Sequence, residues 1–205
     1  MVKLTKISEG SEADIYKYNL FGLDCIIKYR RKKNYLIDNI DEMLRLKRTK
    51  KEAKIIIHAN NNKIRVPSVL LVGKYSIYME YINGVSLNQI DSSKFNKKMF
   101  FNIGELLKKI HSNGIVHNDF TIANLILYKN LIYVIDFGLS EFSTADEERA
   151  IDLLLMKNSI NKNFYDEFIK GYKKSNTFFK QVFSKLENIE KRGRYQIRTL
   201  ETKER

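Results

Sequence analysis

The sequence contains one cysteine, one proline and nine glycines in 205 residues. The single Cys25 excludes an internal disulfide bond and a zinc site made of several cysteines. No apolar run approaches the roughly 20 residues that a membrane-spanning helix needs, and the N-terminus lacks the apolar core of a signal peptide. The chain has no internal repeat and no low-complexity linker. These absences predict a soluble, cytoplasmic protein without a membrane segment.

Apolar residues and positive charge are abundant instead. Hydrophobic residues make up 43% of the chain and aromatic residues 12%, which is enough for a buried core. A length of 205 residues fits one large domain or two small lobes that share a cleft. The formal net charge of +13 fits a polyanionic partner, or it reflects the base composition of an AT-rich genome.

Two short motifs in the second half of the chain carry chemistry. His117, Asp119 and Asn124 fit the pattern H-x-D-x-x-x-x-N, and D-F-G follows at residues 136–138. In this order and at this spacing they are the catalytic and metal-binding motifs of protein-kinase-like enzymes. We therefore interpret Asp119 as the catalytic base, and Asn124 and Asp136 as ligands of Mg²⁺. His117 is interpreted as a structural residue that orients the loop.

The segment between the two motifs predicts a tight hairpin. Apolar residues 125–128 and 131–135 flank a Lys-Asn pair that is suited to a turn. Such a hairpin would carry Asn124 at the mouth of one strand and Asp136 at the end of the other. Two oxygen ligands would then lie close enough together to hold one magnesium ion.

Residues 4–30 predict three strands, with a polar loop between the first two. The loop aligns with the kinase pattern G-x-G-x-x-G-x-V, although only the middle glycine is present. Small residues let the backbone approach phosphate groups, whose charge is met by amide N–H groups. By itself, a polar loop with one glycine fits an ordinary hairpin equally well. The residues predicted to bind nucleotide here are Ser8, Gly10, Ser11, Glu12, Ala13 and Ile15.

Lys28 ends an apolar strand and matches the lysine of the kinase V-A-I-K element. It alone interrupts the apolar face, which favours binding to the α- and β-phosphates of ATP over the role of a solvated strand-end lysine. Apolar spacing predicts a helix from residue 36 to about residue 60. Glu52 on this helix is the expected partner of Lys28, and Glu42 is the competitor. For both, the alternative is an ordinary surface ion pair.

Two further strands, predicted at residues 69–72 and 76–82, would complete a five-stranded antiparallel sheet. The end of the second strand would form the hinge between two lobes. The backbone C=O of Glu80 and the backbone N–H of Ile82 suit the edge of adenine, and Met79 would guard the pocket behind it.

The rest of the chain is predicted to be helical, at residues 95–112, 147–156, 162–173 and 175–190. No A-P-E follows D-F-G, and the short interval before the helix predicted at residue 147 leaves no room for an activation segment and peptide-docking platform of ordinary length. Asp152 is expected to brace the catalytic loop, unless it is only a carboxylate favoured by the helix dipole. Basic and aromatic residues interleave at 191–198, which fits contact with RNA as well as a solvated terminus.

Together these segments resemble the small atypical kinase of the KEOPS complex, the piD-type or p53-related protein kinase family. The resemblance implies an α+β, bilobal protein-kinase-like fold that binds ATP and Mg²⁺. Residues 1–82 would form an N-lobe, with a five-stranded antiparallel sheet and one main helix. Residues 83–205 would form a reduced helical C-lobe without an activation segment. The resembling segments are residues 8–13, 26–28, 48–53, 79–84, 117–124, 134–139, 150–153 and 191–194.

The resemblance also implies a serine/threonine phosphotransferase and ATPase. It would support the threonylcarbamoyl transferase subunit of KEOPS, which modifies adenosine in tRNA, with the basic tail reaching toward the RNA. The family more often has Gly-Asp-Leu where this chain has Asn118-Asp-Phe, which concerns the loop and not the metal site. The alternatives are a RIO-type protein kinase of ribosome maturation, a small-molecule kinase of the aminoglycoside type, and an inert kinase-shaped scaffold. A missing C-terminal substrate-binding extension argues against the small-molecule kinase.

Overall fold

The computed structural model describes residues 4–10, 12–20 and 22–201, with side chains except at residue 20 and at residues 193–201. Ser11, which was predicted to bind nucleotide, lies outside the described residues. The chain divides into two compact units. The first unit combines residues 1–90 with 123–141, and the second combines residues 91–122 with 142–205.

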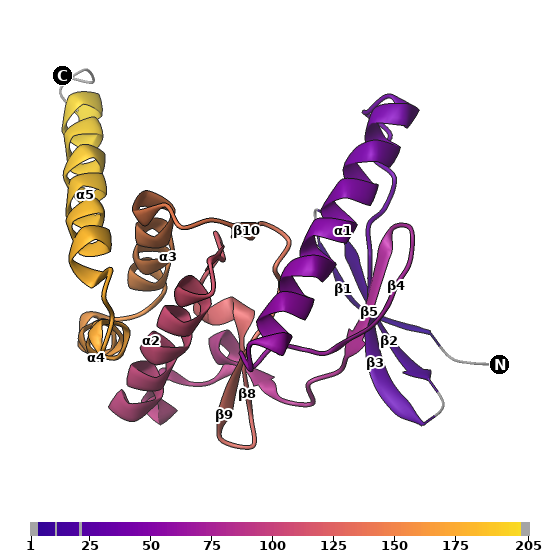
Figure 1. The fold of residues 1–205 in the computed structure, drawn as a ribbon, viewed down its shortest axis with the longest axis horizontal. Coiled ribbons are helices and arrows are strands. Elements are labelled where there is room, and N and C mark those ends of the chain that lie inside the picture. The colour runs from indigo at the N-terminus through magenta and orange to yellow at the C-terminus, as the bar shows by residue number, and fades with distance from the viewer. Residues whose placement is uncertain (1–3, 11, 21, 202–205) are drawn as a thin grey trace. The chain divides into compact units, whose positions relative to one another are not determined.

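The first unit is built on a five-stranded antiparallel sheet, as predicted for the N-terminal lobe (Figure 1). Its strands run in the order β1-β2-β3-β5-β4. Because alternate side chains of a strand share one face, Ile26, Lys28 and the following Arg30 point to the same side of β3. The strands are β1 (Thr5–Glu9), β2 (Asp14–Leu20), β3 (Leu23–Tyr29), β4 (Val69–Val72) and β5 (Ser76–Glu80).

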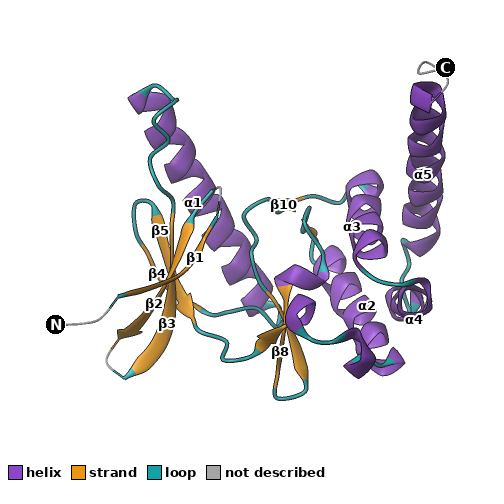
Figure 2. Cartoon of the chain, turned by 180° about the vertical axis from the view of Figure 1, so that it is seen from behind, coloured by secondary structure: helices purple, strands orange, loops and turns teal. Residues whose placement is uncertain are grey.

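Helix α1 (Asp38–Asn61) lies along one face of this sheet (Figure 2). Its ends fall within two residues of the predicted ones. Ala53 of α1 packs against Ile77 and Met79 of β5 in a buried apolar cluster. This packing brings the middle turns of α1 over the centre of the sheet, and therefore over the β3 face that carries Lys28.

A second, three-stranded sheet in the first unit holds the predicted hairpin. It runs in the order β6-β8-β9, with β6 at Val85–Ser86, β8 at Leu125–Tyr128 and β9 at Leu131–Val134. Lys129 and Asn130 have φ values of 49° and 61°, and positive φ at both central residues is typical of a type I′ turn. The hairpin groups with the first unit because β8 pairs with β6, the strand that follows the hinge. The division between residues 82 and 83 stays a prediction.

The second unit is helical. Helices α2 and α4 pack closely, and a Cβ atom on Gly104 of α2 would collide with the backbone of Phe168, as would one on Gly171 of α4 with that of Phe101. The side chains of Asn96 and Asn161 cap the N-termini of α2 and α4. The helices are α2 (Lys97–Ser112), α3 (Asp146–Ser159), α4 (Lys162–Lys173) and α5 (Phe179–Glu201), and the shorter elements are β7 (Ile115–Val116), β10 (Glu141–Phe142), η1 (Leu87–Gln89), η2 (Ser92–Lys94) and η3 (Ile122–Asn124).

The limits predicted for the last helix, residues 175–190, were wrong. Ser175 has a φ of 50°, which interrupts the helical backbone before α5 begins at Phe179. The helix then continues to Glu201 and takes in the basic segment that was read as a tail. Lysine, arginine and glutamine are good helix formers, so a high density of basic residues does not itself end a helix. None of the helices in the described part of the chain is long and apolar enough to cross a membrane.

Candidate active site

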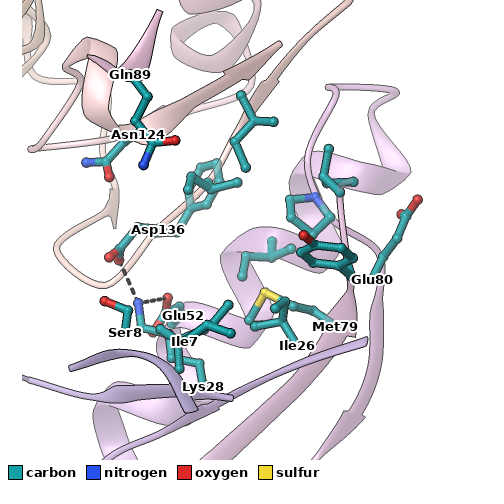
Figure 3. Close-up of a pocket in the computed structure, with 18 residues that line it drawn as sticks. Ile7, Ser8, Ile26, Lys28, Glu52, Met79, Glu80, Gln89, Asn124 and Asp136 are labelled. Carbon is teal, nitrogen blue, oxygen red and sulfur yellow. Dashed lines mark hydrogen bonds and ion pairs between the residues drawn. The ribbon is translucent and has the colours of Figure 1, made fainter. Parts of the chain in front are cut away.

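A cavity of about 410 Å³ lies in the first unit, within the usual size range of small-molecule sites (Figure 3). The residues that line it come from the sheet, from α1, from the hinge and from both ends of the β8–β9 hairpin. Of the loop residues predicted to bind nucleotide, Ser8 and Ile15 line the cavity, whereas the described Gly10, Glu12 and Ala13 do not. The predicted residues that line it are Ser8, Ile15, Lys28, Glu52, Met79, Glu80, Ile82, Asn124 and Asp136.

One end of the cavity is apolar and is bordered by the hinge. Ile26 and Met79 lie at this end, on the opposite side from Asn124 and Asp136 (Figure 3). The backbone N–H of Glu80 donates to Ser68 O at 2.9 Å, and that of Tyr81 donates to Asp24 O at 3.3 Å. The backbone N–H of Ile82 has no hydrogen-bond partner within the described residues. An apolar slot with an unused backbone donor at its edge suits a planar ring that carries an acceptor nitrogen.

Lys28 is the centre of the polar end. Its Nζ lies 2.7 Å from Oε1 of Glu52 and 2.6 Å from Oδ1 of Asp136 (Figure 3). Lys28 and Glu52 are 7% and 1% exposed, so this ion pair is almost completely removed from water. Burial by itself would lower the pKa of Lys28, but the two carboxylates outweigh it and raise the pKa above the usual value. The ammonium group therefore stays charged and held in place.

The structure also distinguishes the two candidate partners of Lys28. Glu52 forms the buried pair, whereas Glu42 forms an ion pair with Lys74 and its side chain is 48% exposed. The two glutamates are ten positions apart on α1, and Glu52 is among the buried residues of this helix whereas Glu42 is not. The expected Lys28–Glu52 pair is therefore present.

The hairpin brings Asn124 and Asp136 to the same end of the cavity. The backbone N–H of Ile135 donates to Asn124 O at 2.9 Å, which joins Asn124 to the residue before Asp136 at the hairpin mouth, and the side chains of Asn124 and Asp136 line the same part of the cavity (Figure 3). Asp136 has a φ of 59°, in the left-handed region that is uncommon for residues other than glycine, although aspartate and asparagine enter it more readily than most, and that is often found at functional sites. Its Oδ1 also accepts from the backbone N–H of Gly138 at 3.1 Å, and its side chain is 49% exposed. An amide oxygen and an accessible carboxylate are ligands that Mg²⁺ prefers.

The loop that carries Asp119 belongs to the second unit, and Asp152 of α3 holds it. The two carboxylate oxygens of Asp152 accept from the backbone N–H groups of His117 at 2.8 Å and Asn118 at 2.7 Å. Asp152 is fully buried. The expectation that Asp152 braces the catalytic loop is therefore confirmed. His117 is also fully buried, as a residue that orients the loop should be.

Asn118 has a φ of 61°, which explains the residue type at this position. Glycine reaches this left-handed region without strain, and asparagine is among the few other residues that tolerate it. An asparagine at this position is therefore compatible with the observed backbone conformation.

Sequence reasoning missed His111, a buried residue of α2 that completes the support of the loop. Its Nε2 lies 3.0 Å from Oδ2 of Asp152, and its Nδ1 lies 2.8 Å from the hydroxyl group of Tyr172. Burial lowers the pKa of His111, although Asp152 acts in the opposite direction. A neutral imidazole with these partners donates from Nε2 to the carboxylate and accepts at Nδ1 from the tyrosine. The only available signal was a histidine within the apolar pattern of the helix.

Arg30 was also missed, because it begins a run of four residues that reads as a basic surface segment. It is only 3% exposed, and its Nη2 lies 2.6 Å from Oε2 of Glu52. Its spacing of two from Lys28 on an alternating strand was the signal that could have identified it.

The sheet with its helix, the Lys28–Glu52 pair and the hairpin that ends in Asp136 define a protein of the protein-kinase-like class. Comparison with known proteins makes this assignment more specific. The RIO domain model matches residues 15–177. The Rio2 kinase of Chaetomium thermophilum, solved as an ADP/Mg²⁺-phosphoaspartate complex, superimposes with a TM-score of 0.66 over 95% of this chain and 71% of that one. At 14% identity this likeness shows the fold alone.

Two relatives are much closer in sequence. The EKC/KEOPS complex subunit BUD32 of Enterocytozoon bieneusi is 38% identical, over 92% of this chain and 97% of its own length. A probable bifunctional tRNA threonylcarbamoyladenosine biosynthesis protein of Methanococcus maripaludis is 39% identical over 92% of this chain. The chain spans only about a third of that bifunctional relative, 36% of its length. The chain therefore belongs to the RIO domain family, and more particularly to the family of the Bud32 subunits.

Proposed function

We propose that this chain binds ATP with Mg²⁺ in the cavity of the first unit and transfers the terminal phosphoryl group to a serine or threonine hydroxyl or to water. The observation that carries the proposal is the fixed position of Lys28, between the buried Glu52 and the accessible Asp136. Phosphoryl transfer depends on positioning and on the stabilisation of phosphate charge. A cation held in place near Asn124 and Asp136, the proposed metal ligands, meets this requirement. The RIO domain match and the ADP and Mg²⁺ bound by Rio2 support the same class of chemistry.

Each predicted residue has a role in this proposal. The hinge backbone at Glu80 and Ile82 would bind the edge of adenine, with Met79 behind it. Lys28 would bind the α- and β-phosphates. Asn124 and Asp136 would hold Mg²⁺, which neutralises phosphate charge when bound. Asp119 would accept the proton of the attacking hydroxyl group or water molecule.

We also propose that the chain works as a KEOPS subunit in the cytoplasm and supports the modification of tRNA with threonylcarbamoyladenosine. The names and coverage of its relatives support this role. The partners would be the threonylcarbamoyl transferase and the other KEOPS subunits. The basic C-terminal segment, of which Lys191 and Arg192 are exposed, would contact tRNA.

Turnover of ATP by the purified chain tests the chemistry. Asp136→Asn and Asp119→Asn should each lower turnover about a hundredfold or more, because each removes a group that acts on the reacting phosphate or hydroxyl. Asp166→Asn, on the exposed surface of α4, is the matched control and should leave turnover unchanged. Turnover that survives either site variant would contradict the assignment. Nucleotide binding without any turnover would favour the inert scaffold.

Binding of tRNA tests the second part. Removal of residues 191–205 should weaken tRNA binding and flatten its dependence on salt concentration, because fewer counterions are released. The double variant Lys97→Gln/Lys98→Gln, on the exposed start of α2, removes two charges elsewhere and serves as control. An unchanged salt slope would restrict the excess of basic residues to solubility. Recovery of the transferase subunit with the tagged chain from native lysate tests the assembly.

A further inference from the structure

The carboxylate of Glu52 holds a second cation besides Lys28. Its Oε1 pairs with Lys28 at 2.7 Å, and its Oε2 pairs with Arg30 at 2.6 Å. Lys28 and Arg30 are both buried and share one face of β3, so each oxygen of Glu52 is committed to one cation. Arg30 is therefore a second buried partner of Glu52, in addition to Lys28.

Arg30 reaches two other parts of the site. Its Nη1 lies 3.8 Å from Oε2 of Glu12, in the loop between β1 and β2. Its Nη2 also faces Gly138 of the D-F-G segment: a Cβ atom built on this glycine would lie 3.7 Å from Nη2 and 3.0 Å from Oδ1 of Asp136. The guanidinium group therefore lies beside α1, the D-F-G segment and the loop between β1 and β2, which we call the nucleotide loop. A planar group with five donors can serve several such partners at once, which an ammonium group cannot.

Glu12 links the loop between β1 and β2 to two further basic residues. Its Oε1 pairs with Lys33 at 2.8 Å, and its Oε2 pairs with Arg48 of α1. Burial would raise the pKa of Glu12, but the hydrogen bonds from Lys33 and Arg48 outweigh it and lower the pKa. A carboxylate has no attraction for a phosphate, so the predicted contact of Glu12 with the nucleotide is better explained as a contact with the cations that hold the loop.

The backbone of the loop is held as well. Arg31 pairs with Glu9 at 2.6 Å and donates to Gly10 O at 3.0 Å, and the N–H of Gly10 donates to Ala13 O at 3.0 Å. A Cβ atom at Gly10 would lie only 2.9 Å from Ala13 O, so the turn requires glycine here. The described residues of the loop therefore form a turn closed by the Gly10–Ala13 hydrogen bond, and the carboxylates of Glu9 and Glu12 pair with nearby cations.

We propose that Arg30 and Glu12 are positioning residues that tie the nucleotide loop to α1 and to the Lys28–Glu52 pair. Glu12 fixes the loop on Arg48 and Lys33, and Arg30 fixes Glu52 from the side opposite to Lys28. The loop and the phosphate-binding lysine then adopt one relative placement before nucleotide binds. This inference rests on the proposed function for its effect on nucleotide, whereas the tether itself exists without nucleotide.

Two measurements on the full chain test the tether. The first is hydrogen exchange of residues 5–15 without nucleotide, in the wild type, in Glu12→Gln and in the matched control Glu42→Gln. Glu12→Gln keeps the shape of the side chain and removes its charge, so exchange in this loop should rise about fivefold. The control removes a partly exposed carboxylate of α1 that pairs with Lys74, and it should leave the loop unchanged. Equal loop exchange in the wild type and Glu12→Gln would overturn the tether.

The second measurement is the affinity for ATP with Mg²⁺. Glu12→Gln, Arg48→Gln and Arg30→Lys should each raise the dissociation constant about three- to tenfold, and the Glu12 and Arg48 effects should not add in the double variant. Additive effects, or unchanged affinity in Glu12→Gln, would overturn the positioning role. If the wild type binds no nucleotide, the proposed function fails, and the exchange measurement decides the tether separately. Arg30→Lys keeps the positive charge but removes the planar guanidinium group. A loss of affinity in Arg30→Lys that is absent from the control Lys32→Arg identifies the guanidinium as the required group.

Discussion

The ammonium nitrogen of Lys28 lies 2.6 Å from Oδ1 of Asp136, a residue 108 positions further along the chain. The contact joins β3, which carries the lysine proposed to bind phosphate, to the end of the β8–β9 hairpin, which carries the aspartate proposed to bind metal. Lys28 also contacts a third element, α1, through Glu52, while Asp136 accepts a hydrogen bond from the backbone N–H of Gly138 in its own segment. The polar end of the cavity is therefore one connected group of charges.

Lys28→Ala should lower both the affinity for ATP and the rate of its turnover. The change removes a cation that would bind the phosphates, and it leaves Glu52 buried with Arg30 as its remaining partner. We expect a loss of about 2 kcal/mol in the free energy of unfolding, less than for a completely unpaired buried charge. Nucleotide titration, turnover and urea denaturation measure the three effects. Lys32→Ala, in an exposed pair with Asp38, should change none of them by much.

Asp152→Ala should lower the free energy of unfolding more than the substitution of an exposed aspartate does. It leaves two backbone N–H groups of the catalytic loop and Nε2 of His111 without their acceptor. We expect a loss of roughly 3–5 kcal/mol in the free energy of unfolding. In Asp146→Ala, which removes a partly exposed ion pair with Arg149 on the same helix, the loss should stay below about 1 kcal/mol. Similar urea midpoints for the two variants would contradict the bracing role.

His111 should make the chain less stable as the pH falls below about 6.5. Burial lowers its pKa in the folded state, so the unfolded state takes up the proton first and stability is lost below the unfolded pKa. The loss is at most about 1.4 kcal/mol per pH unit. Urea denaturation at pH 7.5 and 5.5 should show a smaller decrease for His111→Gln than for the wild type. The half-buried His58 is the control, and His58→Gln should keep the wild-type decrease. Identical decreases in the wild type and His111→Gln would refute the argument.

Asn118→Gly should fold and function like the wild type, whereas Asn118→Val should not. The φ of 61° suits glycine and asparagine, but a β-branched side chain meets the backbone there. We expect Asn118→Val to lower the free energy of unfolding by about 1–3 kcal/mol and to lower turnover, because Asp119 is the next residue. Thermal unfolding and turnover of the two variants check this. A valine variant as stable as the glycine variant would contradict the prediction, because the positive φ at residue 118 would then not be needed for stability.

Much of the fold follows from local patterns that can be read along the chain. Helix α4 has its predicted limits, and the β8–β9 hairpin has its predicted turn. These elements depend on apolar periodicity and on turn residues within a few positions of one another. The end of α5 was missed because the helix continues into the basic residues after 190, which were interpreted as a tail.

The sequence by itself determined the residue types of the site: the two spaced motifs, the lysine in an apolar strand and a choice between two glutamates. The tertiary structure decided which glutamate meets Lys28, and it revealed Arg30, His111 and the anchoring contacts of Glu12. The reason is physical. Motif spacing is set by local backbone geometry. An ion pair between residues distant in sequence depends instead on which helix face packs against the sheet, and a charge that this packing buries must be paired.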